Sequence, residues 1–286
     1  MRRFTDRGLR LRTVFVLASV VWLDLDGLGA EVLPWTRLSE GLAITLWDPA
    51  AQCRQMVPPL VLVDIDPERY RFAVFHYRDE RLDAPLSLDE WQERTRATML
   101  FNAGLFRPDY SYMGLLRKDG RLLSSKEHPQ WKGLFVAEPV TRPAPNARVV
   151  DLAAEPFAGS RPAYREAAQA LMLFDQSGRP RVRRSEKRAQ QTAVAETRNG
   201  HLVVIKTTSD VALWDLAQCL AEKRPELLHA MAMDGGSSSD LRLTETTAAG
   251  REISPAGATW QPFMNGTAGV HIPLPTVIGV FPREPG

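Results

Sequence analysis

The chain has 286 residues, of which 44% are hydrophobic and 24% are charged, and its formal net charge is +2 at pH 7. These values are ordinary for a globular protein and allow one large domain or two small ones. The nearly balanced charge gives no indication of a nucleic-acid partner. The sequence has no CxxC, HExxH or clustered His/Cys spacing, so we expect no metal site and no cofactor. Cys53 and Cys219 can pair in an oxidising compartment, but their spacing does not show how close they are.

The first thirty residues have the pattern of a secretory signal peptide. A basic segment precedes the apolar run 13–23, and the small residues 27–30 follow it. This run is too short to cross a membrane comfortably, and the alternatives are a buried N-terminal helix or an uncleaved anchor. We predict a signal peptide over residues 1–30, a domain over residues 31–286 and a periplasmic or secreted location, with no stable membrane span after cleavage. The net charge belongs to this leader, whose basic residues are Arg2, Arg3, Arg7, Arg10 and Arg12.

Apolar runs predict several strands in the N-terminal half of the domain. They cover residues 43–47, 60–66, 71–77 and 98–106, and residues 110–123 form a hairpin around Asp119-Gly120. We expect residues 71–77 to pair with residues 60–66. Ser87 and Glu90 have the spacing of a capping box, which predicts a helix that ends near residue 97.

The C-terminal half mixes helical and strand patterns. Residues 139–162 are interpreted as a loop across one domain, and the basic run 181–188 as a solvated loop. The predicted elements are a helix over 164–170, an apolar segment over 171–174, a hairpin over 191–205 with its turn at 198–200, a helix over 211–221 capped by Ser209 or Asp210, and a closing strand over 269–280. Together they predict an α+β fold, namely a single domain with a mixed β-sheet core and a few packed helices, the last of which covers one sheet face.

An apolar strand at residues 229–233 runs directly into Asp234, two glycines and three serines. A plain hairpin turn returns to apolar residues after Asp-Gly, whereas here the polar segment continues. Consecutive backbone N–H groups in such a turn can bind an anion. The segment lacks the Gly-Lys-Ser/Thr of a phosphate loop and the flanking glycines of a nucleophile elbow. By itself it is either a site or only a turn.

These elements, in this order, resemble the phosphodiester glycosidase family, which includes secreted bacterial exopolysaccharide-related proteins. The similarity covers about residues 40–281. It rests on the segment 101–106 with Asn102 and Gly104, a hairpin with Gly114 and Gly120, Gln169 before an apolar segment, the strand 191–195 leading to Gly200, and Asp234 to Ser239.

The resemblance implies hydrolysis of a sugar–O–phosphate diester at the anomeric carbon, with a carbohydrate phosphodiester as the substrate. It implies catalytic roles for Asp234 and Asn102. The residues implied to bind substrate are Gln169, Thr192, Gly235, Gly236 and Ser238. The glycine N–H groups and Ser238 would hold the phosphate, and Asn102 and Gln169 would contact sugar hydroxyls or an acetamido group.

Three departures from the family pattern leave alternatives open. Gln191 and His271 stand where the family has arginine, and Ser237 replaces a glycine; the basic run 181–188 is a candidate replacement for the lost arginine. The alternatives are a non-catalytic envelope protein that binds a glycan or an anionic polymer, and an interaction protein of envelope assembly. A structural role also stays open for Asn102 and Gln169. Asp64, Asp66, Asp234 and Asp240 can contribute to a cation site, but no spacing requires one.

Overall fold

Two neighbouring strands with apolar residues on both faces form the centre of the fold. A computed structural model describes residues 33–53, 57–156, 163–244 and 272–284. In it, β3 (Leu60–Ile65) pairs antiparallel with β13 (Leu202–Thr207). Successive side chains of a strand point to opposite faces, so Val61 and Val63 enter one hydrophobic core while Leu60 and Leu62 enter another. A strand that is buried on both faces has a continuous apolar sequence, and both segments have one.

The large sheet to which these strands belong has eleven strands, with neighbours in the order β1-β2-β3-β13-β12-β15-β10-β6-β7 and with β8 and β9 branching from β10. The other strands are β1 (Thr36–Ser39), β2 (Leu42–Trp47), β6 (Leu116–Lys118), β7 (Arg121–Ser124), β8 (Gly133–Pro139), β9 (Ala147–Asp151), β10 (Tyr164–Phe174), β12 (Thr192–Thr197) and β15 (Leu227–Ala232).

A second sheet has four strands in the order β16-β5-β17-β4, and a two-stranded sheet joins β11 to β14. Their bounds are β4 (Tyr70–His76), β5 (Met99–Asn102), β16 (Leu241–Leu243), β17 (Thr276–Pro282), β11 (Arg188–Ala189) and β14 (Val211–Ala212). The main hydrophobic core contains side chains of both larger sheets and lies between them. The described residues belong to one compact unit, Val32–Gly286.

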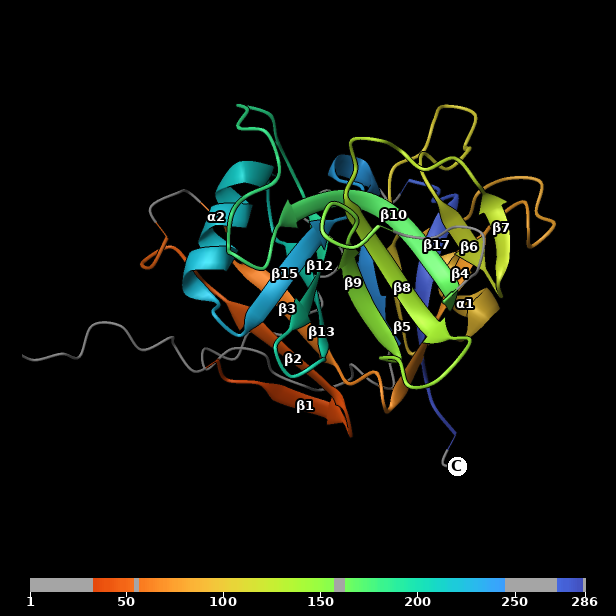
Figure 1. The fold of residues 1–286 in the computed structure, drawn as a ribbon, viewed down its shortest axis with the longest axis horizontal. Coiled ribbons are helices and arrows are strands. Elements are labelled where there is room, and N and C mark those ends of the chain that lie inside the picture. Colours follow the sequence, from red (N-terminus) through yellow and green to blue (C-terminus); the bar gives the residue numbers. More distant parts are fainter. Residues whose placement is uncertain (1–32, 54–56, 157–162, 245–271, 285–286) are drawn as a thin grey trace, which may run out of the picture. The chain divides into compact units, whose positions relative to one another are not determined.

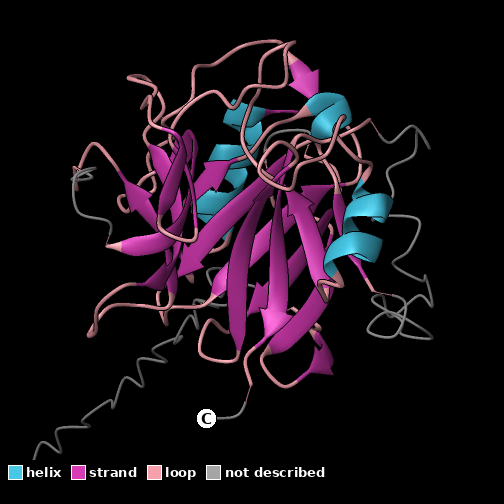
Figure 2. Cartoon of the chain, turned by 90° about the vertical axis from the view of Figure 1, so that its right-hand side faces the viewer, coloured by secondary structure: helices cyan, strands magenta, loops and turns pink. Residues whose placement is uncertain are grey.

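Two helices cover the faces that the two sheets turn away from this main core (Figure 1). Helix α1 (Leu88–Thr95) packs on β5, β16 and β17, and α2 (Leu213–Lys223) packs on β10 and β15. The only other helical segment in the described ranges is the short 3-10 turn Gly236–Ser238. The fold is therefore mostly β-sheet with a small helical share (Figure 2). The α2 helix covers a sheet face as predicted, and neither α-helix is long and apolar enough to cross a membrane.

The capping box predicted at Ser87 is present. The Ser87 hydroxyl accepts a hydrogen bond from the Glu90 N–H, and the Glu90 carboxylate accepts one from the Ser87 N–H at 2.8 Å. The helix ends at Thr95 because Arg96 adopts a left-handed conformation with φ of 55°. The capping box thus fixes the start of the helix, and the left-handed Arg96 ends it close to the predicted residue 97.

The helix predicted over residues 164–170 is wrong, because this segment is the first half of the eleven-residue strand β10. Its alanines and glutamine favour a helix when they are judged in isolation. In the fold, the segment pairs with β8 on one edge and with β6 on the other, and six of the seven residues are buried. Tertiary pairing overrides the local preference.

Three further sequence predictions need correction. β4 pairs with β17 and not with the strand at 60–65, whose partners are β2 and β13. Helix α2 begins at Leu213 and has Ala212 as its N-cap without a side-chain bond, because residues 211–212 form β14. The segment 139–162 contains strand β9 and is not wholly a loop.

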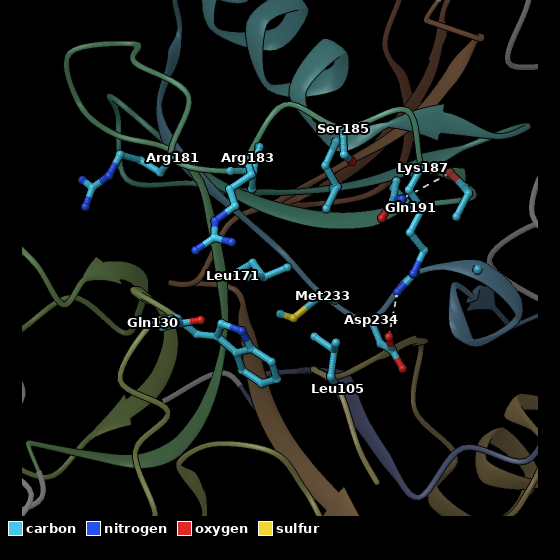
Figure 3. A pocket seen from close by; sticks show the side chains of 16 residues that line it. Leu105, Gln130, Leu171, Arg181, Arg183, Ser185, Lys187, Gln191, Met233 and Asp234 are labelled. Carbon is cyan, nitrogen blue, oxygen red and sulfur yellow. Dashed lines mark hydrogen bonds between the residues drawn. The ribbon is translucent and has the colours of Figure 1, made fainter. Parts of the chain in front are cut away.

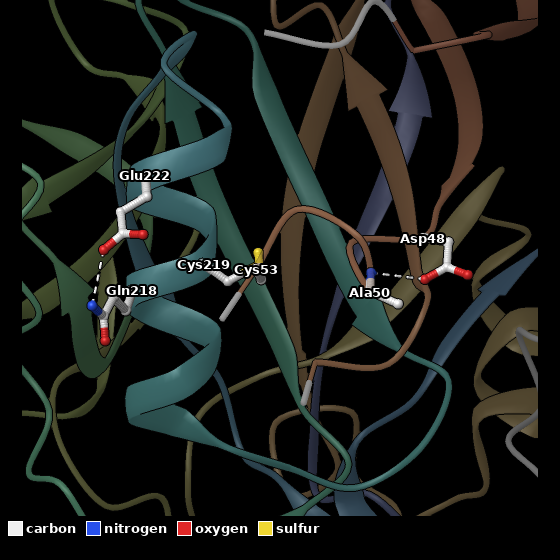
Figure 4. Close-up of a disulfide and its surroundings, with 6 residues drawn as sticks. All are labelled: Asp48, Ala50, Cys53, Gln218, Cys219 and Glu222. Atoms are coloured by element: carbon white, nitrogen blue, oxygen red, sulfur yellow. Dashed lines mark hydrogen bonds between the residues drawn. A yellow bond between two sulfur atoms is a disulfide. The ribbon is translucent and has the colours of Figure 1, made fainter. Parts of the chain in front are cut away.

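A disulfide joins Cys53, which follows β2, to Cys219 on α2, with a Cα–Cα distance of 5.4 Å (Figure 4). The bond spans 166 residues of sequence and lies in the hydrophobic core beneath α2. Both side chains are buried. The pairing that the sequence left open is therefore present, whereas the predicted signal peptide and His271 lie outside the described residues.

Candidate functional site

The polar turn after β15 brings a carboxylate to the end of a strand of the large sheet. Asp234 follows Met233, whose N–H donates to the Thr192 carbonyl, and the Asp234 N–H donates to the Ala103 carbonyl at 3.1 Å. These bonds tie the turn to the large sheet on one side and to the segment after β5 on the other. The Asp234 backbone is therefore held at the junction of the two sheets.

Glycine is favoured at both positions that follow Asp234. A Cβ atom on Gly235 would lie 2.6 Å from the Gln191 Oε1 atom and 3.0 Å from the Gln190 carbonyl. Gly236 has a φ of +70°, a conformation that side chains disfavour. The Gly235 N–H donates to the Asp234 carboxylate at 3.0 Å, and the Gly236 N–H donates to the Gln190 carbonyl at 2.8 Å. Both N–H groups expected to bind phosphate thus have partners within the chain.

Burial raises the pKa of the Asp234 carboxyl above its ordinary value. Hydrogen bonds from the Ser238 hydroxyl and the Gly235 N–H, and the positive charge of Lys187, act in the opposite direction. The carboxyl group is therefore desolvated but oriented by two donors. This combination is common in groups that accept protons or attack carbon.

Asn102, at the end of β5, uses its side chain to join three backbone groups. Its Nδ2 atom donates to the Asp234 carbonyl at 2.8 Å and to the Ala103 carbonyl at 3.1 Å. Its Oδ1 atom accepts from the Asp240 N–H at 3.0 Å. The side chain is 1% exposed, and its hydrogen bonds hold both ends of the polar turn, at Asp234 and at Asp240.

Gln169, in the middle of β10, makes four hydrogen bonds to backbone groups of other segments. Its Oε1 atom accepts from the N–H groups of Leu115 and His128, and its Nε2 atom donates to the carbonyls of His128 and Trp131. All four distances lie between 2.7 and 2.9 Å, and the residue is fully buried. Gln169 therefore positions the loop that carries Trp131.

Thr192 and Ser238 are also buried beside the turn. The Thr192 hydroxyl lies 2.9 Å from the Ser239 hydroxyl and forms a hydrogen bond with it. Ser238, as stated above, bonds to the Asp234 carboxylate. The predicted site residues thus form one connected set around Asp234, apart from Gln169, which acts on the neighbouring loop.

A cavity of about 690 Å³ opens beside this set. Among the predicted residues, Asp234, Gly235 and Gly236 line it, whereas Asn102, Gln169, Thr192 and Ser238 do not. In Figure 3, Leu105, Leu171 and Met233 form the part of the wall between Arg183 and Asp234. Other lining residues are Gln130, Trp131, Arg181, Val182, Ser185, Lys187, Ala189, Gln191 and Leu213.

Three basic side chains of the run 181–188 line the cavity, namely Arg181, Arg183 and Lys187. Arg181 forms ion pairs with Asp151 at 3.0 Å and with Asp175 at 3.4 Å. Asp234 is the one carboxylate among the described lining residues, so positive charge is in excess. The sequence predicts a solvated loop here, and the clustered charge of the run was the signal that it could also bind an anion. Nothing in the sequence marked Trp131 as a cavity residue.

A buried cation lies behind the glycine turn. The Lys206 ammonium donates to the Gln190 Oε1 atom at 2.6 Å and to the Thr207 carbonyl at 3.3 Å, and the residue is 0% exposed. Burial lowers the pKa of Lys206 to about 8, although the charges of Asp240 and Asp210 act in the opposite direction. Gln190 thus connects this ammonium to the Gly236 N–H through its side chain and its carbonyl.

The described residues contain no group of three or more His, Cys, Asp or Glu side chains that could hold a metal ion. Asp64 forms a hydrogen bond with His201 at 2.8 Å. Asp66 caps the turn after β3, where its carboxylate accepts from the Glu68 N–H. Each of these two carboxylates therefore has a local structural partner.

Comparisons with known proteins agree with this architecture. A hypothetical protein from Synechocystis is similar in structure, with a TM-score of 0.59 at 15% identity, and the match covers 89% of this chain and 64% of that one. The catalytic domain of zebrafish N-acetylglucosamine-1-phosphodiester alpha-N-acetylglucosaminidase, auto-inhibited by its pro-peptide, has a TM-score of 0.55 at 12% identity, covering 85% and 82%. The chain thus spans less than two thirds of the Synechocystis protein.

No functionally curated protein matches the sequence. The sequence model of the family described as phosphodiester glycosidase matches residues 95–281. This range covers more than half of the chain, and it includes Asn102, Gln169, the basic run 181–188 and the Asp234 turn. The chain therefore belongs to the phosphodiester glycosidase family.

Proposed function

We propose that the protein is a secreted hydrolase that cleaves a sugar-1-phosphodiester in glycan or exopolysaccharide metabolism. One observation carries the proposal: Asp234, the one carboxylate among the described residues that line the cavity, shares it with an excess of basic side chains. The export of the protein rests on the leader pattern of residues 1–30, which precede the proposed catalytic domain 31–286.

A single carboxylate suits a phosphodiester better than an ordinary glycoside. Most glycosidases use two carboxyl groups, one of which protonates the leaving alcohol. A phosphomonoester leaving group has a second pKa of about 6 and departs as an anion without an acid. When the bond between C1 and oxygen breaks, the electron pair goes to the phosphate, and water supplies the new hydroxyl on C1. The remaining demand is a base or nucleophile at C1, which we assign to Asp234.

Arg183 and Lys187 are proposed to bind the phosphate. Arginine can donate two parallel hydrogen bonds to a phosphate, and Lys187 also affects the charge of Asp234. Arg181 is less suited to this role because Asp151 and Asp175 already pair with it. Since the N–H groups of Gly235 and Gly236 are bonded within the chain, these glycines are proposed to shape the phosphate site rather than to donate to it.

Asn102, Thr192 and Ser238 are proposed to position the Asp234 turn. Asn102 holds the Asp234 carbonyl, and Ser238 bonds to the carboxylate. Gln169 is proposed to act on substrate only through the loop of Trp131. His128 stacks on one face of the Trp131 ring at a centroid distance of 4.0 Å, so the rest of the ring, which lines the cavity, is proposed to contact the apolar face of a sugar. These assignments replace direct substrate contacts with support of the residues that line the cavity.

A non-catalytic binding protein is the second candidate, and one observation favours it. Because the N–H groups of the glycine turn are bonded within the chain, the basic side chains Arg183 and Lys187 are the main donors in the cavity. Such a cavity can bind an anionic glycan without stabilising a transition state. Turnover therefore decides between the two candidates.

The test is the release of free sugar from α-N-acetylglucosamine 1-phosphodiesters by the protein that has residues 31–286. We expect turnover in the wild type and a loss of at least about a hundredfold in kcat for Asp234→Asn. Asp83→Asn, which changes an exposed carboxylate with no role in the cavity, should keep full activity. If the wild type binds these diesters but never hydrolyses them, the binding protein is the correct reading.

The phosphate assignment is tested separately with two arginines from the same run. Arg183 lines the cavity, whereas Arg184 does not. Removal of a charge-assisted hydrogen bond costs about 1.5–3 kcal/mol, so Arg183→Ala should raise KM roughly tenfold or more. Arg184→Ala is the matched control and should leave KM within about twofold. Equal effects of the two substitutions would mean that the loop attracts the anion only by its general charge.

A further inference from the structure

The cavity has an apolar wall that a sugar phosphate alone does not explain. Seven of its lining side chains are aliphatic, aromatic or thioether groups from separate parts of the chain: Leu105, Trp131, Leu171, Val182, Ala189, Leu213 and Met233. Figure 3 shows Leu171, Met233 and Leu105 one after another along the cavity, between Arg183 and Asp234. A sugar platform needs one such aromatic group, whereas this surface is several residues wide.

Three of these side chains also pack against a hydrophobic core of the protein. Leu171, Val182 and Leu213 pack against the core beneath α2 and remain only partly buried. They are therefore held on β10, on the basic loop and at the start of α2. Apolar surface that stays open to solvent in a cavity marks a ligand site more often than a gap in packing.

Apart from its charged side chains, the cavity has few groups that recognise hydroxyls. The neutral polar side chains among the described lining residues are Gln130, Ser185 and Gln191, and the Gln191 amide already donates to the Ala189 carbonyl at 3.2 Å. A sugar that filled the whole cavity would bury hydroxyl groups without partners, which is costly. An aliphatic group against the same wall has no such cost.

The position of the wall relative to the charges defines which part of the substrate it contacts. Val182 lies between Arg181 and Arg183 in the sequence, and all three line the cavity. If Arg183 binds the phosphate, the alcohol esterified to it would lie beside Val182, which is part of this apolar surface. The sugar would occupy the end of the cavity nearest Asp234, beside Leu105, whereas Leu171 lies at the end nearest Arg183 (Figure 3).

We propose that the natural substrate is a sugar-1-phosphodiester of an aliphatic alcohol, and that Leu171, Val182 and Leu213 form the subsite for that alcohol. The inference rests on the proposed function, because it assigns the phosphate to Arg183. In the proposed reaction the C1–oxygen bond breaks and water supplies the hydroxyl of the sugar. The second product is an alkyl phosphate, which keeps the oxygen and its electron pair.

The first experiment measures binding alone. Methyl, butyl and hexyl phosphate are titrated into the wild-type protein by calorimetry. Each fully buried methylene contributes up to about fourfold in affinity, so partial burial should tighten Kd by at least about tenfold from methyl to hexyl phosphate. Equal Kd values across the series would overturn the subsite, and no variant is needed for this result.

Variants then locate the subsite. Leu213→Gln and Leu171→Gln should remove most of the gain from the longer chain while the Kd of methyl phosphate changes little. Leu122→Gln, a control at a leucine that is 46% exposed elsewhere on the surface, should keep the full series. Thermal unfolding verifies that each variant is folded, and a chain-length gain that survives both cavity substitutions contradicts the assignment.

Hydrolysis separates this inference from the proposed function. The substrates are α-N-acetylglucosamine 1-phosphodiesters of methanol and hexanol. A higher kcat/KM for the hexyl ester supports both proposals, and equal values overturn the subsite but keep the hydrolase. Tight binding of hexyl phosphate without hydrolysis of either ester would overturn the hydrolase and keep the apolar subsite.

Discussion

At the scale of single residues, the two buried amide side chains of the predicted site mainly hold the backbone in place. The donors and acceptors of Asn102 and Gln169 all bond to main-chain groups. The sequence marked both as unusual polar residues beside apolar segments. It did not distinguish a side chain that faces a substrate from one that faces a carbonyl, because both need the same chemistry in the same strand.

Gln169→Ala tests this structural role. The substitution leaves four backbone groups, two of them in buried hydrogen bonds, without their partners, and we expect the free energy of unfolding to fall by about 2–4 kcal/mol. KM for a substrate should also rise, because the loop of Trp131 loses its anchor. Urea unfolding and steady-state kinetics measure the two effects. Gln218→Ala, which removes a surface amide of α2, should change neither, and a Gln169→Ala protein of wild-type stability would contradict the interpretation.

Lys206 supplies the second prediction at this scale. Its pKa of about 8 lies below the ordinary value of 10.5, so the buried ammonium loses its proton as the pH rises through 8. Asp240 and Asp210 then keep their negative charges nearby, and anion binding in the cavity that Gly236 lines should weaken. We expect Kd for inorganic phosphate to rise roughly tenfold between pH 7 and pH 9.5, because the Coulomb attraction of the ammonium through a partly polar medium is lost.

Lys206→Met isolates this effect from the titration of exposed groups. The variant should bind phosphate weakly at pH 7 and show a much smaller change toward pH 9.5. Lys126→Met removes an exposed lysine and should reproduce the wild-type curve. A Lys206→Met protein with the wild-type pH dependence would exclude a role for the buried ammonium in anion binding.

At the scale of elements, sequence succeeded where a local motif fixes the structure. The capping box at Ser87 and the turn at Asp119-Gly120 are both present, since a few neighbouring residues determine each. The strand β10 was missed because its alanine-rich first half is buried on both faces and has no period of two. The pairing of β4 with β17 was missed because the partners lie about two hundred residues apart, and periodicity carries no information about partners.

The edge strand β4 shows how elements of the two sheets are joined. The Glu166 carboxylate on β10 accepts from the Val74 N–H of β4 at 2.8 Å and from the Asp119 N–H at 2.9 Å. Glu138 similarly accepts from the Phe72 N–H of β4. Burial raises the pKa of Glu166 to about 7, against the opposing effect of these N–H groups. A titratable carboxyl group therefore covers part of the open edge of the small sheet.

This arrangement predicts a dependence of stability on pH. The folded-state pKa of Glu166, about 7, exceeds the unfolded value of 4.5, so between these values the folded state binds more protons. Its contribution is then greatest below pH 4.5 and is lost as the pH rises to 7, a decrease of about 2–3 kcal/mol at most. Urea unfolding at pH 5, 6, 7 and 8 should reveal this decline.

Glu166→Gln should flatten that profile, because the amide does not titrate. The variant also loses one hydrogen bond to a backbone N–H, so its stability at pH 5 should lie below that of the wild type. Glu127→Gln, at an exposed position, provides the control and should follow the wild-type decline. Parallel profiles for the wild type and Glu166→Gln would assign the pH dependence to other groups.

At the scale of the whole molecule, two sheets share one core, and the site lies where they meet. Asp234 follows a strand of the large sheet, and Asn102 ends a strand of the small one. The Asn102–Asp234 bond therefore couples the integrity of the site to the packing of the two sheets. The family resemblance implied catalytic roles for both residues but did not predict the bond between them. The sequence also gave no account of the cavity wall, whose residues come from distant segments.

The Cys53–Cys219 disulfide makes the last prediction. It closes a sequence separation of 166 residues and connects the segment after β2 to α2, which carries one wall of the cavity at Leu213. Because a long closed loop restricts the unfolded chain, replacement of both cysteines by serine should lower the free energy of unfolding by about 2–5 kcal/mol. Urea unfolding should remain a single transition in both proteins, since the main core is common to both sheets. Reducing agent should shift the wild-type midpoint toward that of the double variant and leave the variant unchanged. Identical midpoints for the oxidised and reduced wild type would mean that packing of α2, rather than the covalent link, holds this side of the cavity in place.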